Sequence, residues 1–158
     1  MTQRTVAYAR REDLDRVNQL RAQVSALHAQ GRPDIFRPDF SPQLRDYVYE
    51  VFDSPDSDVV VVREDGVICG FAMVEYIRRP LSPYNLARSF YHIEEFGVDP
   101  AFRRRGHASA LMDFCRREAR RMGYPHVELD MWEFNQSALR FYEAQGFRTI
   151  RRYMELDV

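Results

Sequence analysis

Residues 96–108, Phe-Gly-Val-Asp-Pro-Ala-Phe-Arg-Arg-Arg-Gly-His-Ala, combine the end of an apolar strand, a turn and the start of a helix. Asp99-Pro100 marks the turn. Beyond the turn, apolar residues recur at the three-and-four spacing of one buried helix face: Ala108, Leu111, Met112, Cys115, Ala119 and Met122. This spacing predicts a helix that begins near Arg104 or Arg105.

The start of this helix suits an anion. It lies among three arginines and has no carboxylate or hydroxyl cap, so its free N–H groups and positive dipole end lack an obvious partner. Gly106 and Ala108 are small enough to let a phosphate approach the backbone. The alternative interpretation is an ordinary strand-turn-helix with a solvated basic corner, and this stretch alone does not decide between the two.

A second stretch decides the interpretation. Residues 103–108 resemble the (Arg/Gln)-x-x-Gly-x-(Gly/Ala) signature of the GNAT superfamily of acyl-CoA-dependent N-acyltransferases. Asn135-Gln-Ser-Ala138-Leu-Arg-Phe141-Tyr142-Glu-Ala-Gln-Gly146-Phe147 is similar to the Asn-x-x-Ala-x-x-Phe-Tyr-x-x-x-Gly-Phe segment of the same superfamily. The clear resemblance covers residues 93–147. Ala108 in place of the commoner glycine and the bulky His107 are small departures.

The resemblance implies that acetyl-CoA binds at this turn. Backbone N–H groups of residues 104–109 would hold the pyrophosphate, and Arg103 or Arg104 could reach a CoA phosphate. Phe96 and Val98 would pair through their backbone with the pantetheine arm, and Gly97 is a candidate bulge residue that opens the sheet. The expected cofactor-binding residues are Phe96, Gly97, Val98, Arg103, Arg104, Arg105, Gly106, His107, Ala108, Ser109, Asn135, Ala138 and Tyr142.

Asn135 and Tyr142 are seven residues apart, so both project from one helix face. By resemblance, Asn135 contacts the pantetheine arm and the Tyr142 hydroxyl donates to the sulfur of the leaving thiolate. The alternatives are a helix N-cap for Asn135 and an aromatic core residue for Tyr142.

Transfer to an amine also needs a base, because an alkyl amine with a pKa of about 10 is mostly ammonium at neutral pH. Strand alternation places His92, Glu94 and Phe96 on one face and Ile93 and Glu95 on the other, until a bulge resets the register. In the family a carboxylate on this strand often serves, so Glu94 is the first candidate. His92, Glu95 and Asp130 follow it, and substrate-binding or sheet-edge charge is the alternative for all four.

The acceptor amine is expected where the loop over residues 31–42 and the loop over residues 80–85 meet the open end of the sheet. Asp34, Phe36, Glu75 and Tyr84 are the candidate acceptor-binding residues. Carboxylates there favour a cationic amine, whether a small molecule, a polyamine or a protein N-terminus. Transfer is expected to be direct, from thioester to amine in a ternary complex. An acyl-cysteine intermediate is not expected, because Cys69 and Cys115 are both predicted to be core residues.

Length and composition fit one N-acetyltransferase domain over residues 1–158, with 45% hydrophobic residues and a formal charge of -1. This charge offers no global field for nucleic acid or an anionic membrane, and no metal-ligand spacing is present. Every basic residue other than histidine is arginine, so acetylation of its own lysine side chains is excluded. A cytoplasmic location is expected, and the oligomeric state is open, with a homodimer as one option.

Periodicity predicts an α/β (α+β) fold with the element order strand, two helices, three strands, helix, strand, helix and strand. Strands are expected over residues 5–9, 59–62, 67–77, 89–98, 126–132 and 147–156, and helices over 14–27, 42–54, 104–123 and 135–145. The resemblance implies a mixed, mostly antiparallel sheet of six to seven strands, flanked by about four helices and splayed between its fourth and fifth strands.

Two other functions compete with the enzyme. A catalytically silent acyl-CoA-binding regulatory module would keep the phosphate-binding turn over residues 103–109, called the cradle below. The presence of Tyr142, Asn135 and the acidic strand residues favours catalysis instead. A nicotinamide-dependent oxidoreductase is disfavoured because no Gly-x-Gly-x-x-Gly follows the first strand.

Overall fold

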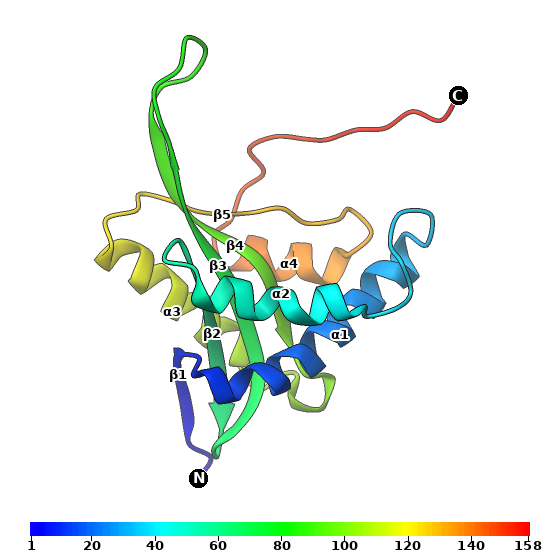
Figure 1. Cartoon of the computed structure of the whole chain (residues 1–158), viewed down its shortest axis with the longest axis vertical. Helices are drawn as coiled ribbons and strands as arrows, with labels where there is room; N and C mark the ends of the chain where they lie inside the picture. The colour runs from blue at the N-terminus through cyan, green and yellow to red at the C-terminus, as the bar shows by residue number, and fades with distance from the viewer.

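A computed structural model describes residues 1–158 (Figure 1). Five strands form one sheet in the order β1-β2-β3-β4-β5. The strands are β1 (Arg4–Tyr8), β2 (Ser57–Glu64), β3 (Val67–Arg79), β4 (Arg88–Val98) and β5 (Val127–Leu129). The helices are α1 (Leu14–Gly31), α2 (Pro42–Asp53), α3 (His107–Arg121) and α4 (Gln136–Ala144), with short 3-10 turns η1 (Arg11–Asp13) and η2 (Pro100–Phe102).

The helices cover both faces of the sheet. One apolar cluster joins α3 to the sheet through residues such as Leu111, Met112 and Ile93, with Phe141 of α4 packed against it. A second cluster joins α1 and α2 to the opposite face through residues such as Leu20, Val48 and Phe71. Because both faces are buried, the run of four valines in β2 is almost wholly inaccessible, as its unbroken β-branched pattern predicts. None of the helices has the length and apolar character needed to cross a lipid bilayer.

The helix boundaries follow their caps. The Ser41 hydroxyl accepts a hydrogen bond from the Leu44 N–H at the start of α2, as the Ser-Pro pair predicts. Asn135 caps α4 in the same way, by accepting from the Ala138 N–H. Helix α3 begins at His107, two to three residues later than expected, because Gly106 takes a left-handed conformation (φ 80°) that ends the preceding turn.

A β-bulge interrupts β4 at Glu94. Glu95 lies opposite Met73 and Ile93 lies opposite Val74, so Glu94 is the extra residue. This bulge resets the register, the condition attached to the expected alternation, so beyond it Phe96 packs with the α3 cluster and not on the face of Glu94. The bulge also lies three residues before Gly97, the candidate named from the sequence.

Gly97 has a different role from the one expected. It pairs regularly with Phe71, and a Cβ atom there would lie 2.7 Å from Val24 Cγ2 of α1. The absence of a side chain therefore lets α1 pack close against β4.

Strands β4 and β5 diverge, as the resemblance implies. They run parallel and pair only from Tyr91–Val127 to Ile93–Leu129. Residues 94–98 therefore have no strand partner on this side, and β5 is shorter than the expected strand over residues 126–132.

The prediction of a last strand over residues 147–156 is wrong, and the sheet has five strands rather than six or seven. Gly146 (φ 95°) ends α4, and Phe147 closes the helix by donating its N–H to the Tyr142 carbonyl. Residues 148–158 are exposed and make no backbone hydrogen bond. The sequence pattern of this segment is typical of a strand, but no strand of the sheet pairs with it.

Candidate active site

The turn between β4 and α3 presents unpaired backbone donors. The N–H groups of residues 104–109 donate to no other group of the chain, and the first to do so is that of Ala110, which bonds to the Gly106 carbonyl. Arg104 (φ 61°) and Gly106 (φ 80°) both adopt left-handed conformations, which turn successive N–H groups toward the same side. The turn is therefore shaped to hold an anion at the start of α3.

A cavity of about 230 Å³ opens over this turn. Its lining combines the end of β4, the turn, the start of α3 and one residue of α4: Val98, Phe102, Arg103, Arg104, Gly106, His107, Ala108, Ser109 and Phe141. Arg103 and Arg104 make no ion pair within the chain, so both guanidinium groups are available to phosphates. Ser109 is held at the cavity by a hydrogen bond from the Gln145 amide at 3.2 Å.

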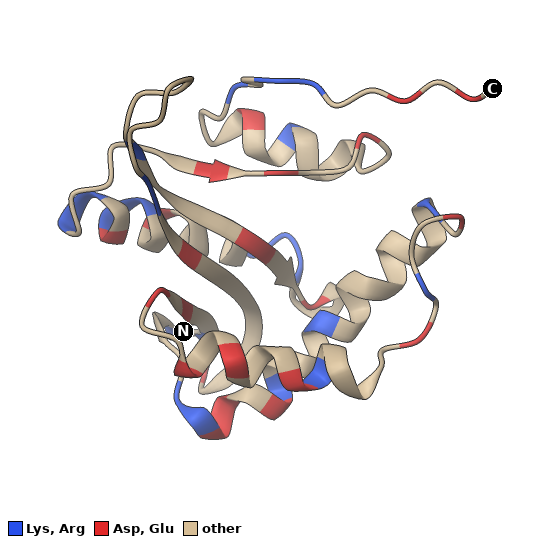
Figure 2. Ribbon diagram, turned by 45° about the horizontal axis from the view of Figure 1, so that its top comes forward, with Lys and Arg blue, Asp and Glu red and all other residues tan.

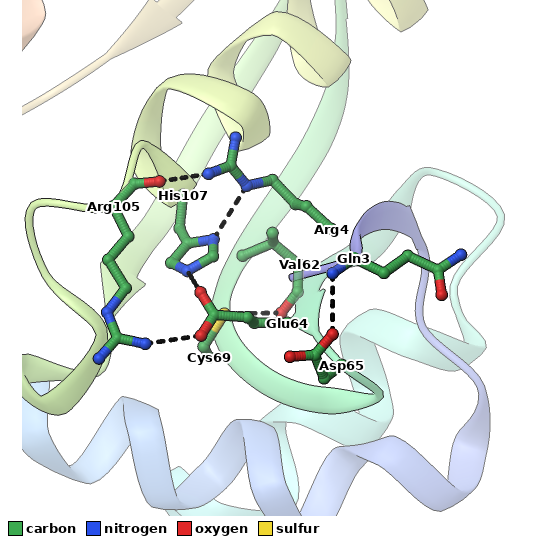
Figure 3. A network of polar contacts seen from close by, with 8 residues as sticks. All are labelled: Gln3, Arg4, Val62, Glu64, Asp65, Cys69, Arg105 and His107. Atoms are coloured by element: carbon green, nitrogen blue, oxygen red, sulfur yellow. Dashed lines mark hydrogen bonds and ion pairs between the residues drawn. The ribbon is translucent and has the colours of Figure 1, made fainter. Parts of the chain in front are cut away.

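Arg105 and His107 are engaged elsewhere, in a polar network beneath the turn (Figure 3). Arg105 lies 2.6 Å from one Glu64 oxygen, and His107 Nε2 lies 2.8 Å from the other. Arg4 donates to His107 Nδ1 at 3.2 Å and also to the Arg105 carbonyl. Since Nδ1 accepts, Nε2 carries the proton and donates to Glu64. These side chains therefore tie the turn to β1 and β2, although His107 also borders the cavity.

The free edge of β4 leads into the cradle. Phe96 and Val98 direct their side chains into the α3 cluster, while their backbone groups on the β5 side have no strand partner. Glu94 and Glu95 lie at the start of this edge and Arg103, Arg104 and Arg105 follow its end; Figure 2 colours acidic positions red and arginines blue along the ribbon. An extended ligand could add here as a strand, with an anionic end in the cradle.

Tyr142 and Asn135 lie on α4, beside this edge. The Tyr142 ring packs against Phe96 at 6.2 Å and Phe147 at 5.6 Å, and its hydroxyl makes no hydrogen bond within the chain. Burial raises the pKa of Tyr142 to about 12, so the hydroxyl stays protonated and can donate. The side-chain oxygen Oδ1 of Asn135 accepts a hydrogen bond from the Ala138 N–H at 3.2 Å, so Asn135 is the N-cap of α4. Its side-chain NH₂ group makes no hydrogen bond within the chain.

Glu94 is a shielded carboxylate. One oxygen accepts a hydrogen bond from the Tyr47 hydroxyl at 2.6 Å, and the other is buried without a partner. Burial raises the pKa of Glu94, and the nearby Glu75 and Glu95 raise it further, against the lowering effect of the Tyr47 hydrogen bond. A carboxylate with a raised pKa is suited to take a proton near neutral pH.

The other candidate bases have partners or lie in the open. Glu95 is paired with the buried Arg21, at 2.7 and 3.1 Å. His92 Nδ1 lies 3.2 Å from Glu75. Asp130 is mostly exposed, with Arg151 at 4.0 Å. Glu94 therefore differs from the other three in having a buried oxygen with nothing bound to it.

Tyr47 and Arg21 were not identified as site residues from the sequence. Tyr47 lies on α2, and its hydroxyl donates a hydrogen bond to Glu94. Arg21 falls between Val17 and Val24 on the buried face of α1. An arginine within an apolar helix face was the signal that could have indicated a buried charge partner.

The two loops expected to form the acceptor site do not meet. The β3–β4 pairing continues to Arg79–Arg88, so the following loop lies at the tip of a projecting hairpin (Figure 1). Tyr84 at this tip is fully exposed and lies beyond the six residues, or about 20 Å of strand, that separate Arg88 from Glu94. Tyr84 therefore lies away from the site, because the hairpin extends past the sheet.

The other candidate acceptor residues have partners within the chain. Glu75 contacts His92, and Asp34 is held by Arg32 at 2.8 and 2.9 Å. Phe36 stacks on His28 at 5.1 Å and meets the edge of Trp132 at 5.1 Å. These aromatic contacts connect the end of α1 with the loop after β5, so they span the opening between β4 and β5.

An open strand edge that ends in an anion cradle suits a long cofactor with phosphate at one end, and the tyrosine and carboxylate beside it suit group transfer. A fold and site of this kind are arranged for group transfer from such a cofactor. The family model described as the acetyltransferase (GNAT) family matches residues 29–147, and the chain belongs to this family.

Curated relatives are N-acetyltransferases with different acceptors. The L-ornithine N5-acetyltransferase NATA1 of Arabidopsis thaliana is 26% identical over 123 residues, which are 76% of this chain and 52% of that protein. The glucosamine 6-phosphate N-acetyltransferase of Trypanosoma brucei brucei is 42% identical over 72 residues, 45% of this chain and 46% of that protein. The chain spans about half the length of these curated relatives.

Solved structures match more of the chain. The tetramutant of the BH1408 protein from Bacillus halodurans has a TM-score of 0.92 at 26% identity, and the match covers 98% of this chain and 99% of that one. The aminoglycoside N-acetyltransferase AAC(6')-Iy in complex with CoA has a TM-score of 0.78 at 19% identity, over 100% and 96% of the two chains. At that identity the second match shows the fold alone.

The substitution Glu64→Gln tests the network beneath the cradle. It should lower the free energy of unfolding by about 1–3 kcal/mol, because a charge-assisted contact to Arg105 or His107 is lost while both partners remain. Chemical denaturation measures the effect. The matched control is Asp65→Asn, which keeps the oxygen that accepts from the Gln3 N–H and should change stability by less than about 0.5 kcal/mol. Equal effects of the two changes would contradict the network's role.

Proposed function

We propose that this chain transfers the acetyl group of acetyl-CoA directly to a primary amine bound in the same complex. The observation that carries the proposal is the shielded carboxylate of Glu94, a bulge residue that directly follows Ile93, the last residue of β4 paired with β5. The cradle at the other end of the same free edge supports a phosphate-bearing cofactor. Membership of the acetyltransferase (GNAT) family supports acetyl-CoA as that cofactor.

The cofactor would lie along β4. Its pyrophosphate would accept hydrogen bonds from the N–H groups of residues 104–109, with Arg103 and Arg104 near the phosphates. The pantetheine arm would pair with the backbone of Phe96 and Val98. The thioester would then lie near Glu94 on one side and the Tyr142 hydroxyl on the other.

The reaction removes two protons from the nitrogen and needs the leaving group stabilised. Glu94 would take the first proton from the bound ammonium, directly or through water, and the freed nitrogen would attack the thioester carbonyl. As the carbon–sulfur bond breaks, the nitrogen would release its second proton, which balances the charge of the departing thiolate, so that amide and CoA thiol result. Tyr142 would donate a hydrogen bond to this sulfur and remain un-ionised, because of its raised pKa. Holding both reactants together supplies much of the acceleration.

The acceptor is proposed to be a cationic primary amine. Glu75 and Glu94 would attract an ammonium group, and the aromatic rings of Phe36 and Trp132 are placed to contact its apolar portion. The names of the relatives include ornithine, glucosamine 6-phosphate and peptidyl-lysine acetylation, which share only the amine. Residues 32–41 and 130–135, around this opening, would therefore decide among acceptors.

The function is tested by thermal unfolding with and without acetyl-CoA, followed by thiol release across a panel of amines. Acetyl-CoA at one hundred times its dissociation constant should add about 2.7 kcal/mol of stability. Gly106→Arg should abolish this shift, whereas Gly123→Arg, at an equally left-handed position facing open space, should retain it. Thiol release with one class of amine would identify the acceptor. A shift without release from any amine would favour the silent binding module, and no shift would refute the cradle.

Tyr142→Phe removes the proposed sulfur contact. We expect kcat to fall about 100-fold with the affinity for CoA retained, because the ring packing is kept and only the hydroxyl is lost. Steady-state kinetics and calorimetric titration with CoA provide the two readouts. The control is Tyr84→Phe at the hairpin tip, where no change is expected. Unchanged kcat in Tyr142→Phe would remove the residue from the chemistry.

Glu94 should control the acidic limb of the pH profile. A base works only when deprotonated, and since the pKa of Glu94 is raised, kcat/KM should begin to fall at a higher pH than an ordinary carboxyl would cause. Glu94→Gln should lower kcat/KM about 100-fold or more and flatten this limb. Asp65→Asn, at an exposed carboxylate in the turn between β2 and β3, is the control. An unaltered limb in Glu94→Gln would assign the base to another group.

A further inference from the structure

One face of the β3–β4 hairpin changes from acidic to basic along its length. Three cross-strand pairs follow one another on it: Glu75 with His92, Ile77 with Phe90, and Arg79 with Arg88. They share a face because side chains two residues apart on a strand point the same way. Phe71 and Met73, earlier on this face of β3, pack with α1 and α2, so Glu94, which accepts from Tyr47 of α2, lies on this face too. The hairpin carries the face outward from the candidate base to beyond the body of the molecule (Figure 1).

The basic end of this face gathers two guanidinium groups over one aromatic ring. The guanidinium carbon of Arg88 lies 4.5 Å, and that of Arg79 5.8 Å, from the ring centroid of Phe90. Arg88 is paired with Glu128, whereas Arg79 is exposed and makes no ion pair in the chain. Residues 80–87, which join the two strands, contain no charged side chain. One carboxylate therefore faces two guanidinium groups, and the basic end keeps a net positive charge.

The acidic end adjoins the candidate base. His92 Nδ1 lies 3.2 Å from Glu75, and Glu94 follows two residues later on β4, with one oxygen buried and unpartnered. Between this end and the guanidinium groups lies only the uncharged pair of Ile77 and Phe90. Opposite charges thus stand at the two ends of an apolar strip, an order that suits a ligand with an ammonium group at one end and an anion at the other.

The spacing of the two ends is one that a small molecule can span. Four residues of strand, from Glu75 to Arg79, cover about 13 Å. The two arginines shorten this gap because their side chains fold back over Phe90, whose ring centroid lies 6.2 Å from that of His92. The two charges of a matching ligand would lie about 10 Å apart, which is the reach of an extended tripeptide at about 3.3–3.6 Å per residue.

We propose that Arg79 and Arg88 bind an anionic group, a carboxylate or a phosphate, on the same acceptor whose amine lies at Glu94. This inference rests on the proposed function and narrows its acceptor to an amine that carries an anion about 10 Å away, the reach of three extended residues. Guanidinium groups bind carboxylate and phosphate through paired hydrogen bonds. The strip fixes the direction of such an acceptor, with the amine toward the thioester and the anion toward the hairpin tip, whereas a diamine of the same length would place its second charge against the arginines.

Two pairs of acceptors that differ only in the anion test the proposal. Triglycine is compared with triglycinamide, and aminohexyl phosphate with aminohexanol. For at least one pair, kcat/KM of the anionic member should exceed that of its neutral partner about 10-fold, mainly through a lower KM. The pair that responds identifies the anion as carboxylate or phosphate. If neither pair responds, the proposal fails.

Neighbouring arginines supply the matched variants. Arg79→Gln should remove the preference for the anion and leave turnover of the neutral acceptors unchanged. Arg78→Gln removes the same charge one residue away and should keep the preference, because the Arg78 guanidinium lies over Tyr124, which packs in the α3 cluster on the opposite face. Arg79→Glu should reverse the preference, so that a diamine becomes the better acceptor. An equal loss in Arg78→Gln and Arg79→Gln would indicate a diffuse positive field and overturn the site.

Binding to the CoA complex separates this site from the proposed chemistry. Calorimetric titration of the CoA-saturated protein with the anionic acceptor needs no acetyl transfer, and Arg79→Gln should weaken this binding about 10-fold. Binding that depends on Arg79 without thiol release from any acceptor would support the site and refute the transferase. Turnover of amines with no preference for an anion, and with binding unaltered in Arg79→Gln, would support the transferase and overturn the site.

Discussion

The buried guanidinium group of Arg21 is the interaction on which the arrangement of the site depends. It is 2% exposed and pairs through two nitrogens with Glu95, while also donating to Asn18 and to the Leu44 carbonyl. A charge so far from water is tolerated only when its partners are complete. One side chain of α1 therefore holds α2 and β4 in fixed positions, and neither helix can shift without exposing an unpaired charge.

This constraint separates two adjacent carboxylates. Glu95 is neutralised by Arg21, whereas Glu94, the bulge residue beside it, has only the Tyr47 hydroxyl and keeps one oxygen unpartnered. Without the bulge, alternation would send the two side chains to opposite faces of the sheet. With it, both lie toward α1 and α2, one as a structural anion and the other with a raised pKa.

Local features of the fold were predictable from the sequence, and long-range pairing was not. The Ser41 and Asn135 caps, the Gly106 turn and the stop at Gly146 are each decided by a few neighbouring residues, and the structure places them within three residues of expectation. The bulge at Glu94 depends on register between β3 and β4, which no short pattern encodes. Residues 147–156 have the alternation of a strand, but pairing also needs a free edge within reach, and a pattern does not supply one.

Burial of the two cysteines has a practical consequence for measuring turnover. Cys69 and Cys115 are inaccessible, and burial raises the pKa of both thiols, that of Cys115 to about 12. A disulfide reagent added to the folded protein should therefore react with released coenzyme while the polypeptide contributes almost no colour. The chain also has no lysine side chains. It is thus a nearly silent background for both thiol-reactive and amine-reactive dyes, and a single introduced cysteine would provide a unique position for a fluorophore.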